Sequence, residues 1–235
     1  MGGVFNHING DLYAYAGNNP VRYIDPDGND IISITSFYLQ NSSEHKTLPM
    51  GASPSGIFDS NGNLLKQNTI GDYGCLFISI MNTGNSLKRN HFTDLGIPSD
   101  INFNCSPNEY NASDSYFHYS QNPRNQYETD ANMLFDNICN LLKDVSKTSD
   151  FSIEFVIGDD IQKRINAISS NPKENAYVIG RCEGHYFNIN NYSYRYGFRI
   201  HDVFGRSSFD KAKAFLDKIN NGKMDGIIII KPKCD

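Results

Sequence analysis

The chain has 235 residues, which is enough for one sizeable domain with a buried core. Its composition, 39% hydrophobic and 20% charged, is ordinary for a globular protein. The formal net charge is −5 and no basic run appears. We therefore expect no nucleic acid partner, because phosphate binding needs an excess of Lys and Arg on one face.

Neither a signal peptide nor a membrane span is expected. No apolar run approaches the roughly 20 residues that cross a bilayer, and the N-terminus lacks the charged and apolar regions of a signal peptide. The cysteines are odd in number, widely spaced and without a Cys-x-x-Cys pair: Cys75, Cys105, Cys139, Cys182 and Cys234. We therefore expect no metal site, no dense disulfide framework and no cofactor.

The first thirty residues are expected to form a separate unit. Residues 12–28 contain an Asn-Asn-Pro turn and end on an Asp-Pro-Asp-Gly turn, which predicts two short strands that are too small to fold alone. In its order of Tyr, Gly-Asn-Asn-Pro and Asp-Pro-x-Gly, this run resembles the end of the RHS/YD-repeat core. That core closes a large β-shell and precedes a variable C-terminal domain in polymorphic toxins.

The RHS resemblance implies that residues 1–30 are the remnant of a core and that residues 31–235 are an effector tip. Such a tip would be exported as part of a longer RHS protein, with an immunity protein as a partner. In the family the Asp-Pro-x-Gly turn can mark a self-cleavage point, and Asp25 matches it. The supporting shell is missing here, so we place no active site at Asp25. The other interpretation of residues 1–28 is a vestigial tail.

Three elements are predicted before residue 85. Residues 30–39 are rich in β-branched and aromatic side chains and predict a strand or an entry segment into the domain. Residues 58–65 predict a hairpin with Asn61-Gly62 at its turn. A short helix follows, with Asp72 as its N-cap and its end near Gly84. Its apolar face is predicted from positions at helical spacing: Phe77, Ile80, Met81 and Gly84.

Cys75 lies in the first turn of this predicted helix. The backbone N–H groups there point outward and the helix dipole favours an anion, so a thiolate is stabilised. The pKa of such a thiol falls below the ordinary value of roughly 8.5, which makes it a candidate nucleophile. The alternative is a structural cysteine that packs as a small apolar side chain.

Residues 85 to about 127 predict a loop-rich insertion, crowded with Asn, Ser, Asp and Pro and scattered with aromatic side chains. The insertion is either inert or a lid that lines a substrate cleft. Helices and strands alternate after it. Helices are predicted at 130–145, 159–169 and 209–219, and strands at 151–157, 176–180, 184–189, 196–203 and 227–230. Helices first and an antiparallel sheet later indicate an α+β fold.

Two polar residues lie at the ends of apolar rows on neighbouring predicted strands. Alternation places His185 on the face of Phe187, and Asp202 on the face of Ile200, with His201 on the opposite face. Burying His and Asp unpaired is costly, so we expect His185 and Asp202 to pair across the strands. Asp202 would fix the imidazole tautomer and leave one ring nitrogen free to take a proton from a thiol. A purely structural pair is the alternative.

Gly74-Cys75 at a helix start, Gly184-His185-Tyr186-Phe187-Asn188-Ile189 on a strand and Arg199-Ile200-His201-Asp202-Val203-Phe204-Gly205 on the next strand resemble a papain-like cysteine peptidase of the C39-like type. The resemblance implies a papain-like fold and a Cys75, His185 and Asp202 triad. It also implies an oxyanion-hole donor upstream of the cysteine, for which Gln67 is the available glutamine.

The activity implied is that of a thiol-dependent hydrolase or acyl transferase, in the first place a cysteine peptidase acting on a peptide or protein. Peptidase, deamidase, transglutaminase-like and acyltransferase chemistry all use this order of residues. A non-enzymatic or degenerate cassette that binds a protein is the second hypothesis.

Overall fold

The computed structural model describes residues 31–51, 56–94, 105–111, 135–171, 174–193, 197–205 and 209–233. It combines helices with an antiparallel sheet, which confirms the predicted α+β class. Residues 1–30, which carry the RHS resemblance, and most of the expected insertion lie outside these ranges.

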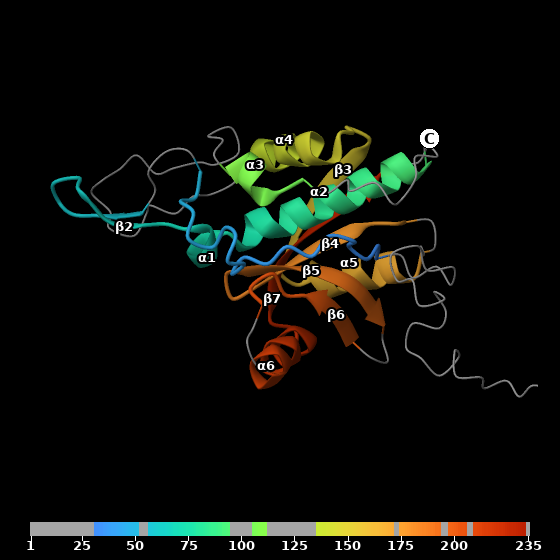
Figure 1. Cartoon of the computed structure of the whole chain (residues 1–235). Helices are drawn as coiled ribbons and strands as arrows, with labels where there is room; N and C mark the ends of the chain where they lie inside the picture. Colours follow the sequence, from blue (N-terminus) through green and yellow to red (C-terminus); the bar gives the residue numbers. More distant parts are fainter. Residues whose placement is uncertain are drawn as a thin grey trace, which may run out of the picture.

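Among the described residues, a five-stranded sheet forms the middle layer (Figure 1). In spatial order its strands are β3 (Phe151–Ile157), β7 (Met224–Pro232), β4 (Tyr177–Cys182), β5 (His185–Ser193) and β6 (Gly197–His201). All four neighbouring pairs are antiparallel. The last strand, β7, is inserted between β3 and β4, and its isoleucine run (residues 227–230) is buried because both faces of the sheet are covered.

Helices cover both faces of the sheet (Figure 1). On one side lie α1 (Ile70–Tyr73), α2 (Cys75–Asp94), α3 (Pro107–Asn111) and α4 (Phe135–Ser146), and on the other lie α5 (Asp160–Ser169) and α6 (Phe209–Asn220). Each side has its own core. Alternation along β4 divides its side chains, so that Tyr177 and Ile179 join the core of α2 and α4 while Val178 joins that of α5 and α6.

Helix α2 lies at the centre of the core that it forms with α4. Residues 77–87 are all buried, because the sheet, α4 and the segment before the hairpin surround the helix. Several of its polar side chains are therefore hydrogen-bonded internally, although Ser79 Oγ has no partner within the described residues. Asn82 accepts from the Tyr38 N–H (2.8 Å) and donates to the Tyr38 carbonyl (3.1 Å). Asn85 makes the same two bonds with the backbone of Cys105.

The predicted end of this helix near Gly84 is wrong, since α2 continues to Asp94. The stretch 85–94, expected to open the loop-rich insertion, is therefore helical. Gly84 does not cap the helix; its missing side chain allows α2 and α4 to pack closely. A Cβ at this position would lie 2.8 Å from Cγ1 of Val145, so only glycine lets α4 approach α2 this closely.

Of the two alternatives for residues 30–39, the strand is wrong and an irregular entry segment is observed. The segment 31–50, here called the strap, is irregular apart from isolated bridges at Ile31 and Pro49. Several of its backbone groups are hydrogen-bonded by side chains of other elements and not by a regular neighbouring strand. Ser86 Oγ accepts from the Thr35 N–H at 2.7 Å, in the same way that Asn82 holds Tyr38. Side chains of α2 thus override the local β propensity of the strap.

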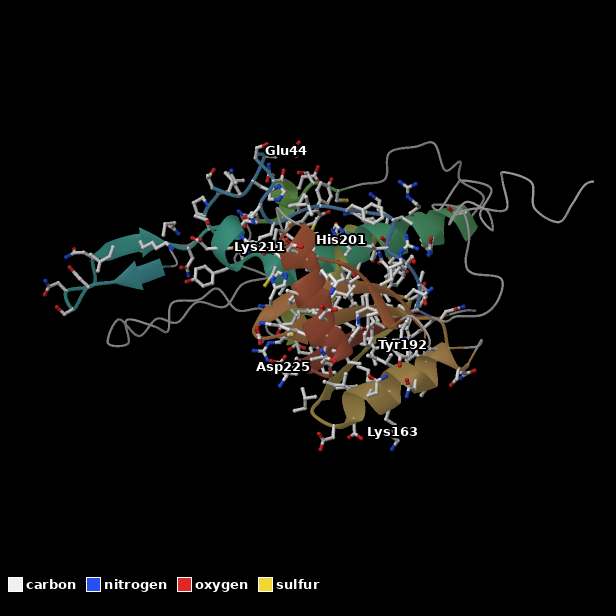
Figure 2. All side chains as sticks on the ribbon, turned by 90° about the horizontal axis from the view of Figure 1, so that it is seen from below. Glu44, Lys163, Tyr192, His201, Lys211 and Asp225 are labelled. Carbon is white, nitrogen blue, oxygen red and sulfur yellow. The ribbon has the colours of Figure 1, made fainter. Side chains whose placement is uncertain are left out.

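The predicted hairpin is confirmed as β1 (Gly56–Phe58) and β2 (Leu64–Gln67). Gly62 has φ of +83°, as a tight turn requires. The hairpin stands away from the body in both views (Figures 1 and 2). The later predicted helices and strands are confirmed within a few residues where they are described, and residues 130–134 of the first of these helices lie outside the described ranges.

Candidate functional site

Cys75 is the first residue of α2, as predicted, but the predicted cap is wrong. Asp72 lies inside the separate short helix α1, whose N-cap is Thr69. The Thr69 hydroxyl accepts the Asp72 N–H at 3.3 Å. A sharp turn therefore separates Asp72 from the helix that begins at Cys75.

Gly74 makes this turn. Its N–H donates to the Ile70 carbonyl at 2.8 Å and closes α1, while its own carbonyl accepts the Ile78 N–H at 2.9 Å and opens α2. A Cβ on Gly74 would lie 2.5 Å from the Ile70 carbonyl oxygen. The glycine before Cys75 is therefore required by the close approach of the two helices.

His185 and Asp202 form the pair expected from strand alternation. Nε2 of His185 lies 2.7 Å from Oδ1 of Asp202, and both side chains are largely buried, at 17% and 15% exposure. Asp202 Oδ1 also accepts the Phe204 N–H at 3.2 Å. The rings of Phe204 and Phe215 stand edge-on to the imidazole at 6.0 and 5.5 Å and enclose the pair.

His201 faces the other side of the sheet, again as predicted. Its Nε2 lies 3.3 Å from the carbonyl of Tyr38 in the strap. Burial lowers its pKa, and this effect outweighs the Tyr38 carbonyl and the charge of Asp202. His201 is therefore a neutral ring that holds the strap.

Cys75 and His185 act on each other's pKa through hydrogen bonding and charge. Because Asp202 occupies Nε2, Nδ1 is the ring nitrogen left available to the thiol. The backbone N–H groups of Tyr186 and Leu76 also lower the pKa of the thiol. The sulfur thus lies among hydrogen-bond donors that favour its anionic form.

These contacts move the pKa values of both groups in opposite directions. Burial would raise the pKa of Cys75, but the hydrogen bonds from His185, Tyr186 and Leu76 outweigh it and lower the pKa. Burial would likewise lower the pKa of His185, but hydrogen bonds to Asp202 and Cys75, with their charges, raise it. The two shifts bring the pKa values of the thiol and the imidazole towards each other, which favours the thiolate form of Cys75 more than in an isolated pair.

Gln67 is the last residue of β2, where it pairs with Gly56, and its side chain is half-buried. Its function as an oxyanion donor stays a prediction. The start of α2 supplies other donors, because the first N–H groups of a helix have no intrahelical acceptor. Tyr73, two residues before Cys75, and Phe204, next to His185, are 36% and 40% exposed.

Sequence reasoning missed two buried amides near the site, Gln40 and Asn188, which are 2% and 0% exposed. Asn188 carries a signal, since a polar residue in the middle of an apolar strand needs a partner on another element. Gln40 lies in the strap, which was predicted to be a strand as far as residue 39, and has no such signal. Sequence reasoning also missed the backbone N–H of Tyr186. A backbone group acts on the Cys75 thiol whatever side chain its residue carries, so it leaves no signal in the sequence.

Within the described ranges, no group of three or more His, Cys, Asp or Glu side chains could hold a metal ion. None of the helices described is both long and apolar enough to cross a membrane. No family model, curated protein or solved structure matches this chain. The site therefore has to be interpreted from its own geometry.

Proposed function

We propose that the chain is a thiol-dependent hydrolase or acyl transferase, and most simply a cysteine peptidase of the papain-like, C39-like type. Cys75 is the nucleophile, His185 the general base and Asp202 the group that orients the imidazole. The observation that carries the proposal is the pairing of His185 Nε2 with Asp202 at 2.7 Å, together with the mutual effect of His185 and Cys75 on each other's pKa.

In the proposed reaction His185 holds the proton of Cys75, and the thiolate attacks a substrate carbonyl carbon. The negative charge that develops on the carbonyl oxygen is stabilised by N–H groups at the start of α2 and by Gln67. His185 then gives its proton to the leaving group, and a thioester remains on Cys75. His185 next takes a proton from water or another acceptor, which attacks the thioester and releases the acyl product and the thiol.

The papain-like arrangement is supported by two features. A buried helix begins at the cysteine, and it packs on an antiparallel sheet that carries His185 on β5 and Asp202 directly after β6. The helix axis points its positive end at the sulfur, where the thiolate forms. The further proposal that this domain is the tip of an RHS-type effector rests on residues 12–28, which lie outside the described ranges.

The test is a screen of a broad peptide library and a set of acyl esters and amides, with product analysis by mass spectrometry. We expect turnover by the wild type and background rates for Cys75→Ala and His185→Ala, each with an unchanged circular dichroism spectrum. The matched controls Cys139→Ala and His201→Asn should retain turnover. Full activity of Cys75→Ala would refute the proposal, and a wild type that neither turns over nor is labelled by thiol-directed acyl probes would favour a binding cassette.

A further inference from the structure

We infer that two buried amides, Gln40 and Asn188, are positioning residues that hold Cys75 in register with His185 and Asp202. The inference rests on the proposed function and extends it. One amide binds the chain four residues before Cys75, at Gly71, and the other binds it four residues after Cys75, at Ser79.

Asn188 joins the strand of His185 to the helix of Cys75. It lies three residues after His185 on β5 and is 0% exposed. Its Nδ2 donates to the Ser79 carbonyl at 3.1 Å and to the Thr83 hydroxyl at 2.9 Å. A carbonyl can only accept, so the amide nitrogen and not its oxygen must face α2.

Gln40 joins the segment before Cys75 to the end of the strand that precedes Asp202. Its Nε2 donates to the Gly71 carbonyl at 2.9 Å, and its backbone N–H donates to the carbonyl of Val203, the residue after Asp202, at 2.6 Å. Gly71 also donates its N–H to the Lys46 carbonyl in the strap at 2.9 Å. Both backbone groups of Gly71 are thus fixed by the strap.

The two amides are poorly suited to a purely stabilising function. Oε1 of Gln40 and Oδ1 of Asn188 are buried and have no hydrogen-bond partner within the described part of the chain. An unsatisfied buried carbonyl destabilises the fold, whereas an apolar side chain of similar volume would avoid this cost. Residues that break a local packing rule in this way are expected where geometry matters more than stability.

The amides span the junction on which the site depends. Cys75 comes from α2, His185 from β5 and Asp202 from the chain after β6. A hydrogen bond weakens steeply when its distance or angle changes, so small shifts between these elements would uncouple the thiol from the imidazole. Two fixed points, one on each side of Cys75, limit both sliding and rotation of the helix start.

The test measures the rate at which iodoacetamide alkylates Cys75 as a function of pH, in the wild type, Gln40→Leu and Asn188→Leu. We expect the midpoint of the pH profile to rise by about one unit in each Leu variant, which lowers the rate at acidic pH by about tenfold. The melting temperature is measured in parallel, because each substitution removes an unsatisfied buried oxygen but also removes the donor to Gly71 or to Ser79 and Thr83. A structural role alone would lower the melting temperature and leave the pH profile unchanged.

The matched control is Asn90→Leu. Asn90 also joins α2 to the sheet through its amide nitrogen, which donates to the Tyr177 hydroxyl at 2.5 Å. It lies 15 residues beyond Cys75, or about 22 Å along the helix at 1.5 Å per residue. The control should therefore keep the wild-type pH profile.

A wild-type profile in both Leu variants would overturn the inference. If a Leu variant does not unfold cooperatively, the smaller substitutions Gln40→Ala and Asn188→Ala remove the same donors and are judged by the same criterion. A wild type whose Cys75 reacts as an ordinary thiol would instead refute the proposed function. The two failures are therefore distinguishable.

Discussion

Replacing Asp202 with Asn removes one negative charge from the site and keeps the shape of the side chain. The amide oxygen can still accept the Phe204 N–H, which now lies 3.2 Å from Oδ1. What is lost is the charge-assisted bond to His185 at 2.7 Å. We expect the variant to fold normally and to label more slowly with a peptidyl electrophile directed at Cys75.

The expected loss follows from the geometry of the pair. A hydrogen bond to a charged group contributes roughly 1.5–3 kcal/mol, which corresponds to about 10- to 150-fold in rate if the bond is made only in the reactive state. The side chains of His185 and Asp202 are 17% and 15% exposed, so solvent screens them less than it screens a surface pair. Removing the orienting group should therefore slow labelling without abolishing it.

The pH profile gives a second readout. The wild type should be active between the lowered pKa of Cys75 and the raised pKa of His185, as a coupled pair. In Asp202→Asn the burial of His185 is less opposed, so its pKa falls and the alkaline limb moves to lower pH. His201→Asn is the control and should leave both limbs unchanged. An Asp202→Asn variant with the wild-type rate and limbs would refute the reasoning.

Two further predictions concern stability. Gly84→Ala should destabilise the fold by about 1–2 kcal/mol in spite of the better helix propensity of Ala, because the new Cβ would lie 2.8 Å from Val145 Cγ1. In a Val145→Ala background the same change should be neutral or stabilising. Urea unfolding that shows no such coupling between the two positions would contradict the packing argument. Glu174 binds Arg164 and Lys231, and these hydrogen bonds lower its pKa from 4.5 to about 2. The contribution of ionised Glu174 to the stability of the fold is therefore complete above the ordinary pKa of 4.5, and it is lost as the pH falls through about 2. Glu174→Gln should cost about 1 kcal/mol at neutral pH, and a difference from the wild type that persists at pH 2 would contradict this assignment.

Periodicity predicted the strands of the sheet well, because the apolar and polar positions of each strand show in its own sequence which faces are buried. The isoleucine run of β7 is apolar on both faces, and alternation along β5 and β6 is enough to direct His185 and Asp202 towards each other. Pairing followed from the cost of burying either group alone. The resulting bond is the part of the site that sequence reasoning predicted most directly.

Tertiary contacts decided the elements that were predicted wrongly. The strap has strand-like residues, yet Ser86 and Asn82 of α2 hold its backbone in an irregular path. Gly84 resembles a C-cap in sequence, but its neighbour Val145 is 61 residues away along the chain and gives no local signal. Asp72 is a good cap in isolation, but the turn at Gly74 separates it from α2.

The most direct test of the central claim compares Cys75 with Cys139 in the native protein. Both are half-buried, but burial raises the pKa of Cys139 while the donors around Cys75 lower its pKa. With a limiting amount of a small alkylator near neutral pH, peptide mapping should find Cys75 modified first, and His185→Ala should remove its advantage. Equal rates for the two cysteines in the wild type would contradict an activated thiolate and with it the proposed chemistry.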